Sequence, residues 1–423
     1  MPDSAASAGL AHPEHSPAGT VLVLGMLSAF GPLSLDLYLP ATPQISASLH
    51  CGQAATQLTV SACLAGLALG QLVIGPLSDS RGRRGPLLVG VASYALLSFG
   101  CALAPNIEWL ILARVLQGLA GSAGLVISRA IVRDLYTGRE AARIFATLTL
   151  ITGVAPVIAP VLGGQLVRFT SWHGMFLALG GVGLLLLVAA WRLPETRPAG
   201  LGQPAGLRSR LRTLGSFAGE RRFAGYALTL GLSQAALFSY IAASPFVIEQ
   251  LFGLSAQAFS ALFAINALGI MLAGQLSRLL VRRVGPGQLL RTALWVQVLS
   301  STALVLTGLG GRPSLLVLMI PLCVTVATIG LVSPNATALA MAPFGATAGS
   351  ASAQLGATQL LIGAMLSPLA GLGGHHSMEP MAALMCLLAW AASITYQLVV
   401  APGRAELARV AMPLGEPDRS QLP

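Results

Sequence analysis

A single carboxylate, Asp36, lies inside a long apolar stretch that covers residues 20–40, and no basic residue shares that stretch. A charged side chain at the centre of a membrane helix costs roughly 2.5 to 3.5 kcal/mol on insertion scales, so a lone acid there first indicates a proton or substrate site. Burial disfavours the charged form of a carboxyl group. We therefore expect Asp36 to hold a proton at neutral pH until substrate, water or a cation approaches. The alternative is that Asp36, about one turn before Pro40, only caps or hydrates the end of its helix.

Arg114 is the second charge expected inside the membrane. It lies several residues inside Trp109, on an otherwise neutral apolar segment. This position favours an inward-facing functional arginine over one whose long side chain reaches back to the membrane interface. The sequence leaves open whether Arg114 pairs directly with Asp36.

Further polar side chains lie within or at the edge of apolar segments, where an unpaired polar group is costly. A ligand pocket is largely apolar with a few such polar anchors. Each of these side chains alone is equally well explained by a hydrogen bond between packed helices. The candidate substrate contacts are Tyr38, Gln57, Tyr240, Asn266, Gln297 and Asn335.

The elements that must position these groups are membrane helices. Of the 423 residues, 55% are hydrophobic and 9% are charged, which is far more apolar than a soluble domain. Continuous apolar runs of helical length, without the alternation of barrel strands, indicate helices that cross about 30 Å of hydrocarbon. We predict an all-α membrane protein with twelve transmembrane helices, which start near Thr20, Leu58, Pro86, Trp109, Phe145, Met175, Ala224, Phe259, Leu289, Leu315, Ala351 and Met381.

Charge placement predicts the orientation of the chain. All 24 basic residues are arginines, and nearly all fall in alternate loops, with only Arg168 and Arg312 in the opposite set. The positive-inside rule then predicts that both termini face the cytoplasm. The net charge of +10 also fits nucleic-acid binding, but arginine clusters without interleaved aromatic residues follow from membrane topology alone. We therefore expect no nucleic-acid partner.

The chain shows no pattern of residues for metal binding or catalysis. Its five cysteines are scattered without a Cys-x-x-Cys pair, so free thiols are expected. His375 and His376 lie in a predicted outer loop without further ligands at suitable spacing, so we assign them no metal. No histidine lies deep in a predicted span, and no His-Glu-x-x-His or paired aspartates appear, which argues against an intramembrane enzyme. We expect no cofactor.

The chain divides into two similar parts. We predict a polar tail (1–19), a six-helix half (20–196), a cytoplasmic linker (197–222), a second six-helix half (223–402) and a second tail (403–423). Residues 75–84 are echoed by residues 274–283, and both segments follow the second span of their half. Such parallel, pseudo-symmetric repeats build transporters whose site lies near the bilayer midplane, between halves that rock against each other.

The loop after the second span has the composition of a gate. Gly75 permits close helix approach, Asp79 is an acidic partner near the helix end, and Gly82, Arg83 and Arg84 form a tight basic turn. The alternative is that these arginines only set topology. The pattern resembles the Gly-x-Leu-x-Asp-x-x-Gly-Arg-Arg signature of the major facilitator superfamily. This resemblance implies a membrane transporter with two six-helix halves.

Other segments are similar to one branch of that superfamily, the Bcr/CflA transporters of bicyclomycin and chloramphenicol resistance. The resemblance runs from about residue 20 to about residue 400, and the segments are 36–40, 68–72, 132–136, 155–160, 171–173, 282–285, 294–297 and 333–336. Arg114 matches the family's Arg-x-x-Gln-Gly motif, whose arginine is implicated in proton transfer. The resemblance thus implies that Arg114 acts in coupling with Asp36.

The fifth span carries a segment that resembles the antiporter signature Gly-Pro-x-x-Gly-Gly. Pro160, Gly163 and Gly164 match it, and Pro156 with Pro160 predicts a kinked helix. Three glycines of the family pattern are replaced by small residues, which still permit close packing but weaken the case for antiport over symport. They are Ala146, Ala155 and Ala159. Some relatives also carry a second acid in the first span, where this chain has Ser28.

The resemblance implies proton-coupled export of small antibiotics, such as chloramphenicol or bicyclomycin, across a bacterial plasma membrane. Proton uptake by Asp36 from outside would accompany drug release, and deprotonation toward the cytoplasm would restore the drug-accepting state. A single acid favours neutral or weakly polar drugs, although a hydrophobic cation could also use it. The alternative is a carrier of a small metabolite, by proton symport or facilitated diffusion. We expect a monomer whose partners are the drug, protons and the lipid bilayer.

Overall fold

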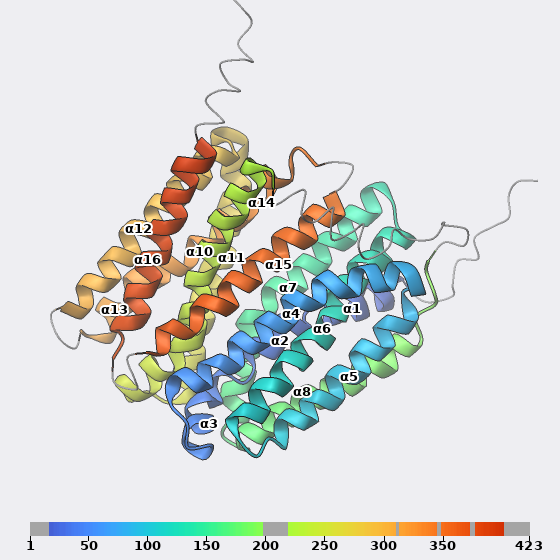
Figure 1. The fold of residues 1–423 in the computed structure, drawn as a ribbon, viewed down its shortest axis with the longest axis horizontal. Helices are drawn as coiled ribbons and strands as arrows, with labels where there is room; N and C mark the ends of the chain where they lie inside the picture. Colours follow the sequence, from blue (N-terminus) through green and yellow to red (C-terminus); the bar gives the residue numbers. More distant parts are fainter. Residues whose placement is uncertain (1–16, 198–218, 310–312, 345–347, 373–376, 402–423) are drawn as a thin grey trace, which may run out of the picture.

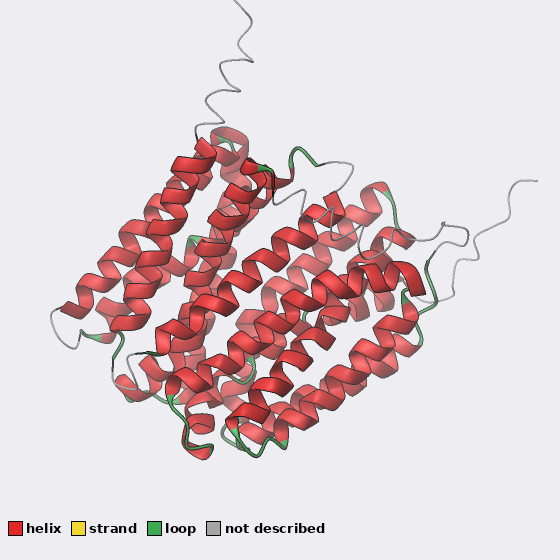
Figure 2. Ribbon diagram, in the orientation of Figure 1, coloured by secondary structure: helices red, strands yellow, loops and turns green. Residues whose placement is uncertain are grey.

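The computed structural model describes residues 17–197, 219–309, 313–344, 348–372 and 377–401, and this part of the chain forms helices joined by short loops, with no strand (Figure 2). Eleven of its helices are long and apolar enough to cross a membrane, and a bent helix pair near the start makes a twelfth span when counted as one. The predicted all-α fold with twelve transmembrane helices is therefore confirmed. The predicted tails and linker, with Arg312, His375 and His376, lie wholly or largely outside the described residues.

The helices form two halves that lie side by side (Figure 1). The first half, coloured blue to green, contains α1 (Pro17–Ser28), α2 (Phe30–Asp36), η1 (Leu39–Ala41), α3 (Thr42–Ser48), α4 (Gln53–Arg81), α5 (Arg84–Ala102), α6 (Ile107–Leu135), α7 (Gly138–Leu166) and α8 (Trp172–Trp191). The second half, coloured yellow-green to red, contains α10 (Arg221–Pro245), η2 (Phe246–Leu251), α11 (Ala256–Val284), α12 (Pro286–Leu309), α13 (Leu315–Ala327), α14 (Ile329–Met341), α15 (Ala348–Leu366), η4 (Ser367–Gly371), α16 (Glu379–Thr395) and η5 (Tyr396–Val400). The halves meet mainly where α4 contacts α15 and where α7 contacts α11.

Successive spans alternate in direction, so the bundle has two distinct ends. We call residues 82–84 the gate loop and the end of the bundle that holds it the gate-loop end; α4, α6 and α11 finish there, and α10 and α15 begin there. The opposite end is the far end, where α4 and α11 begin and where η2 and η4 lie.

The two halves also end their second spans with a similar backbone turn. Helix α4 ends at Arg81 and is followed by Gly82 with φ +91°, while α11 ends at Val284 and is followed by Gly285 with φ +82°. A positive φ is strained for residues with a Cβ atom and is readily adopted by glycine. The same turn therefore closes the second span of each half.

Glycines let α4 and α6 approach until their backbones touch. A Cβ atom at Gly66 would collide with the carbonyl oxygen of Val115, and one at Gly118 would collide with the carbonyl oxygen of Cys63. In a bilayer, where lipid tails are as apolar as leucine, this close van der Waals packing is a main source of helix association. The α4–α6 pair is the rigid support of the first half.

The first span is broken twice. It bends by 44° between α1 and the segment that starts at Phe30, and its second helix ends at Asp36. A continued helix would need the N–H of residue 40 to bond the Asp36 carbonyl, but residue 40 is a proline and has no N–H. The break therefore falls at the one acid of the first span.

Candidate functional site

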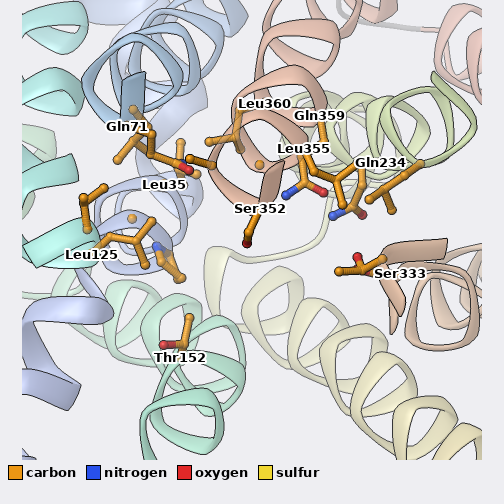
Figure 3. A pocket seen from close by; sticks show the side chains of 18 of the residues that line it. Leu35, Gln71, Leu125, Thr152, Gln234, Ser333, Ser352, Leu355, Gln359 and Leu360 are labelled. Carbon is orange, nitrogen blue, oxygen red and sulfur yellow. The ribbon is translucent and has the colours of Figure 1, made fainter. Parts of the chain in front are cut away.

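A cavity of about 840 Å³ lies between the two halves, and we call it the central cavity (Figure 3). Asp36 lines it, as do Asp79, Arg129 and Arg133, which lie near the gate-loop ends of α4 and α6. The cavity thus extends from the break in the first span to the gate-loop end. A space of this size is within the range of small-molecule sites.

Asp36 is 4% exposed and lines the central cavity. Within the described part of the chain its carboxyl group has no hydrogen bond and no ion pair. A buried charge without a partner is costly. The group therefore suits reversible proton binding from the central cavity.

Arg114 is fully buried and does not pair with Asp36, which answers the question that the sequence left open. Its guanidinium donates to the carbonyl oxygens of Ser34 (2.9 Å) and Thr59 (3.3 Å) and to Oε1 of Gln117 (2.6 Å). No carboxylate among the described residues neutralises it. Since the Ser34 carbonyl lies two residues before Asp36, Arg114 holds the end of the helix on which Asp36 is placed.

Aromatic rings complete the surroundings of Arg114. Its guanidinium carbon lies 4.5 Å from the ring centroid of Tyr38 and 5.6 Å from that of Phe176. The negative faces of such rings attract a cation most strongly where water is excluded. Tyr38 also hydrogen-bonds through its hydroxyl to Thr59 Oγ1 at 2.9 Å. Tyr38 is therefore part of the Arg114 environment and does not line the central cavity.

The structure separates the six candidate substrate contacts into two groups. Tyr240 and Asn266 line the central cavity, and Asn266 Nδ2 donates to the Tyr240 hydroxyl at 2.8 Å. The other four, Gln297, Asn335, Tyr38 and Gln57, do not line it. Gln297 accepts a hydrogen bond from Ser233 (2.9 Å), and Asn335 donates one to Ser277 (2.7 Å). The bonds of Gln297 and Asn335 join helices of the second half, as the helix-packing alternative predicts.

Three glutamines in the central cavity were not among the predicted residues. Gln71 from α4, Gln234 from α10 and Gln359 from α15 all line it and are labelled in Figure 3. Gln234 Oε1 is buried and has no hydrogen-bond partner in the described structure. The signal available in the sequence was the same as for the predicted residues, an amide within an apolar span. The sequence did not show that these three share one space.

The gate loop is held by ion pairs. Arg83 donates from Nε to Asp134 Oδ2 at 2.8 Å and from Nη1 to Asp79 and to Ser78 Oγ (3.0 Å for the latter). Asp134, at the end of α6, was not predicted as a gate residue, although it lies in one of the segments that resemble the family. Arg83 thus fastens the ends of α4 and α6 to each other.

Glu195, just after α8, binds the gate loop through backbone hydrogen bonds. Its carboxylate accepts from the N–H groups of Arg83 (2.7 Å), Arg84 (3.1 Å), Thr196 (3.1 Å) and Arg197 (3.0 Å). Partial burial opposes ionisation, but these N–H groups outweigh it and hold the pKa of the Glu195 carboxyl below its ordinary value. A Cβ atom at Gly82 would lie 2.5 Å from Glu195 Oε2, so glycine also makes room for this carboxylate.

The contacts of Glu195 predict a pH-dependent loss of stability in Glu195→Gln. Because the folded-state pKa is lowered, the carboxylate stabilises the protein above the unfolded-state pKa of about 4.3, and this contribution is lost as pH falls through the lower folded-state value. At neutral pH we expect the variant to lose roughly 0.5 to 1 kcal/mol, a small value because the group is partly solvated. Thermal unfolding of both proteins in detergent checks this. The gap should persist down to about pH 4.3 and close below it, and a gap that does not depend on pH would contradict the assignment.

The segment that resembles the antiporter signature brings α7 against both halves at the far end. A Cβ atom at Gly163 would collide with the Leu37 carbonyl oxygen, one residue after Asp36, and a Cβ atom at Gly164 would collide with Ser260 of α11. Gln257 Nε2 also donates to the Gly164 carbonyl oxygen at 2.7 Å. Pro156 lines the central cavity, and Pro160 is buried within the same helix.

A second contact across the halves closes the far end. Ser61 of α4 and Ser367 of η4 are hydrogen-bonded through their hydroxyls at 2.9 Å. A Cβ atom at Gly371 would lie 2.9 Å from the Cα of Ala54 and 2.6 Å from Gln57 Oε1. The two halves therefore touch at the far end, while the central cavity reaches the gate-loop end.

Comparisons with known proteins agree with this geometry. Residues 22–368 match the family model described as Major Facilitator Superfamily. The chain is 42% identical to the MFS-type transporter YdgK of Bacillus subtilis (strain 168), over 90% of this chain and 96% of that protein. It is 31% identical to the bicyclomycin resistance protein homolog of Haemophilus influenzae (82% and 88% covered) and 32% identical to the chloramphenicol resistance protein of Pseudomonas aeruginosa (79% and 78% covered).

A solved structure shares the fold. The crystal structure of a bacterial homolog of the human lysosomal transporter Spinster, in an inward-facing and unoccupied conformation, superposes with a TM-score of 0.70. It covers 93% of this chain and 99% of its own, at 17% sequence identity. The family model, the relatives and the two-half fold with its central cavity lead to one conclusion. This chain belongs to the major facilitator superfamily, in the branch of the bicyclomycin and chloramphenicol resistance transporters.

Proposed function

We propose that this protein is a proton-coupled exporter of small, neutral or weakly polar antibiotics, of the chloramphenicol or bicyclomycin kind, in a bacterial plasma membrane. The observation that carries the proposal is Asp36, a buried carboxyl group that lines the central cavity and has no partner among the described residues. The names of two relatives, a bicyclomycin resistance protein homolog and a chloramphenicol resistance protein, support the substrate class.

The positive-inside rule places the gate-loop end in the cytoplasm, so the central cavity faces inward in this conformation. A drug that enters from the cytoplasm approaches Asp36 and displaces its proton toward that side. The halves then rock, the far end opens, and the drug leaves. Asp36 takes up a proton from outside, which favours the return of the protein to the inward-facing state. Export is thereby driven by protons that move inward.

The polar lining of the central cavity suits an uncharged drug with hydrogen-bonding groups. Amides come from four different helices, as Gln71, Gln234, Asn266 and Gln359, with the Tyr240 hydroxyl beside them. Amides donate and accept at once, so they serve ligands of varied shape within a mainly apolar space. Gln234 Oε1, without a protein partner, is free to accept from a drug.

Proton release on drug binding tests the proposal. The purified protein in detergent, at weak buffering, receives chloramphenicol or bicyclomycin, and the pH change is compared between the wild type and Asp36→Asn. We expect release from the wild type and none from the variant, because only the carboxyl group carries an exchangeable proton at that position. Absence of release from the wild type, with drug binding shown independently, would contradict competitive exchange at Asp36.

A carrier of a small metabolite is the second candidate function. The replacement of three signature glycines by Ala146, Ala155 and Ala159 favours it, since the antiporter pattern is incomplete. A symporter binds proton and substrate together, so it would take up protons on substrate addition in the same experiment. The sign of the pH change therefore distinguishes the two candidates.

A further inference from the structure

Glu249, two residues before the end of the span Arg221–Leu251, is a further acid that the mechanism proposed above does not use. It belongs to η2, where α10 passes after Pro245 into a π-helix at the far end. Departures from α-helical geometry of this kind are frequent at functional sites. Its Oε1 atom is buried and has no hydrogen-bond partner in the described part of the chain. The residue was not predicted because it stands at the edge of its apolar run.

The elements that make the main contacts with η2 bring no charge to Glu249. These elements are α3 from the first half and α10 and α11 from the second. Helix α3 carries no titratable residue. The arginines of α10 and α11 stand at the gate-loop end of these helices, and Tyr240 of α10 is hydrogen-bonded to Asn266. No cation of these elements therefore compensates a carboxylate at this position.

Glu249 belongs to an element that contacts the other half at the far end. The contact of η2 with α3 joins the second half to the first, as the bond between Ser61 and Ser367 does. We call this group of contacts the far-end seam. Gln57, whose buried amide atoms have no hydrogen-bond partner among the described residues, lies beside Gly371 in this seam. Water that enters an opened seam would hydrate all of these groups.

The protonation of Glu249 must differ between a closed and an open seam. Glu249 is half-buried in the closed seam and its Oε1 atom is enclosed without a hydrogen-bond donor, so the closed seam disfavours the carboxylate and favours the neutral acid. In an open seam water solvates the carboxylate, and the group ionises as an ordinary glutamate does. The closed form thus binds a proton more tightly than the open form.

We propose that Glu249 is a second proton-binding site, separate from Asp36, which closes the far-end seam when protonated and favours its opening when ionised. The ligand is a proton from the side that the far end faces. Asp36 lines the central cavity, which reaches the opposite end, so the two acids exchange protons with different compartments in this conformation. The site depends only on the seam, and it would operate equally in an exporter or a symporter.

Linkage gives the sign of the effect. Because the closed form holds one more proton, a falling pH favours closure and a rising pH favours opening. For a single linked proton the ratio of closed to open form changes by at most about tenfold per pH unit. Removal of the titrating group by Glu249→Gln leaves a permanently neutral side chain. That variant should remain closed at every pH.

Distance measurement between spin labels across the far end tests the proposal. Leu103 after α5 and Leu372 after η4 are 79% and 72% exposed and belong to different halves, so Cys variants at both positions report the separation of the halves. The labels are placed in an Asp36→Asn background, which removes the titration of that acid. Labelling of native thiols is avoided by alanine at Cys51, Cys323 and Cys386, which are the partly exposed cysteines.

In this background we expect short distances at about pH 5 and a growing long-distance population toward about pH 8. Glu249→Gln should abolish the shift and keep the distances short. Glu379→Gln is the matched control, because Glu379 is an exposed carboxylate at the far-end start of α16. In this variant the distances between the labels should change with pH as they do in the parent protein. Glu249→Asp keeps an ionisable group and should retain the shift.

Two results would overturn the proposal. One is a pH-dependent shift that persists in Glu249→Gln with unchanged amplitude. The other is a shift that Glu379→Gln or Glu249→Asp removes as completely as Glu249→Gln does, which would show a general loss of structure. Since the measurement is made without a functional Asp36, failure here leaves proton exchange at Asp36 untouched. Failure of the drug-induced proton release likewise leaves the seam titration in place.

Discussion

Asp36→Asn is expected to reduce export driven by a proton gradient to the level of membranes that lack the protein. Asparagine has nearly the same size and can still hydrogen-bond, but it cannot gain or lose a proton. The variant should therefore fold, reach the membrane and bind drug, while the proton gradient no longer drives the cycle. Drug accumulation in inverted membrane vesicles with an imposed pH gradient, normalised to the amount of protein, measures the effect.

The same variant distinguishes the two interpretations of Asp36. If Asp36 only capped or hydrated the helix end, asparagine would replace it well, because it has nearly the same size and its amide both donates and accepts hydrogen bonds. Preserved export in Asp36→Asn at equal protein level would therefore end the proton-site proposal. Glu379→Gln serves again as control, since it removes an exposed carboxylate and should transport as the wild type does.

Arg114→Lys is expected to lower both thermal stability and transport, the latter by about tenfold or more, which corresponds to a loss of at least about 1.4 kcal/mol. The Arg114 guanidinium reaches three acceptors on different parts of the fold, the carbonyls of Ser34 and Thr59 and the amide oxygen of Gln117. Lysine keeps the charge, but a single ammonium group cannot replace a planar fork with five donors. Buried acceptors that lose their donor cost about 1 to 3 kcal/mol each.

A second effect is the desolvation of a buried cation that has no carboxylate partner among the described residues, a cost that Arg114 already bears. Lysine bears it too, with a more strongly hydrated charge, so this effect adds to the loss. Thermal unfolding in detergent and vesicle transport give the two readouts. Arg291→Lys is the matched control, because Arg291 is an exposed arginine of α12 and should tolerate the exchange. Wild-type stability and transport in Arg114→Lys would show that only the charge matters.

The membrane class and the number of spans could be predicted from the sequence because the bilayer imposes them. A helix must satisfy its own backbone in hydrocarbon and must be long enough to cross it, so length and apolarity alone identify each span. The break at Asp36 could also have been anticipated from Pro40, which cannot donate the next helical hydrogen bond. The turn at Gly82 is local for the same reason, as a positive φ selects glycine.

The partners of the polar residues could not be predicted in this way. Gln297 and Asn335 looked like Tyr240 and Asn266 in the sequence, yet they bond to Ser233 and Ser277 and lie outside the central cavity. An apolar span that is hydrophobic on all sides shows no preferred face, so the local sequence pattern does not predict its rotation about its own axis. Packing against the neighbouring helices decides it.

The sequence by itself therefore determined that the chain crosses a membrane in two repeated halves, with one acid in the first span and a basic gate turn. Only the tertiary structure decided that Arg114 bonds backbone carbonyls and not Asp36, that Glu195 and Asp134 hold the gate loop, and that η2, which carries Glu249, contacts α3 of the other half. The physical reason is the range of the interactions. Burial in lipid and backbone geometry act within one segment, whereas hydrogen bonds and seams join residues far apart in the chain.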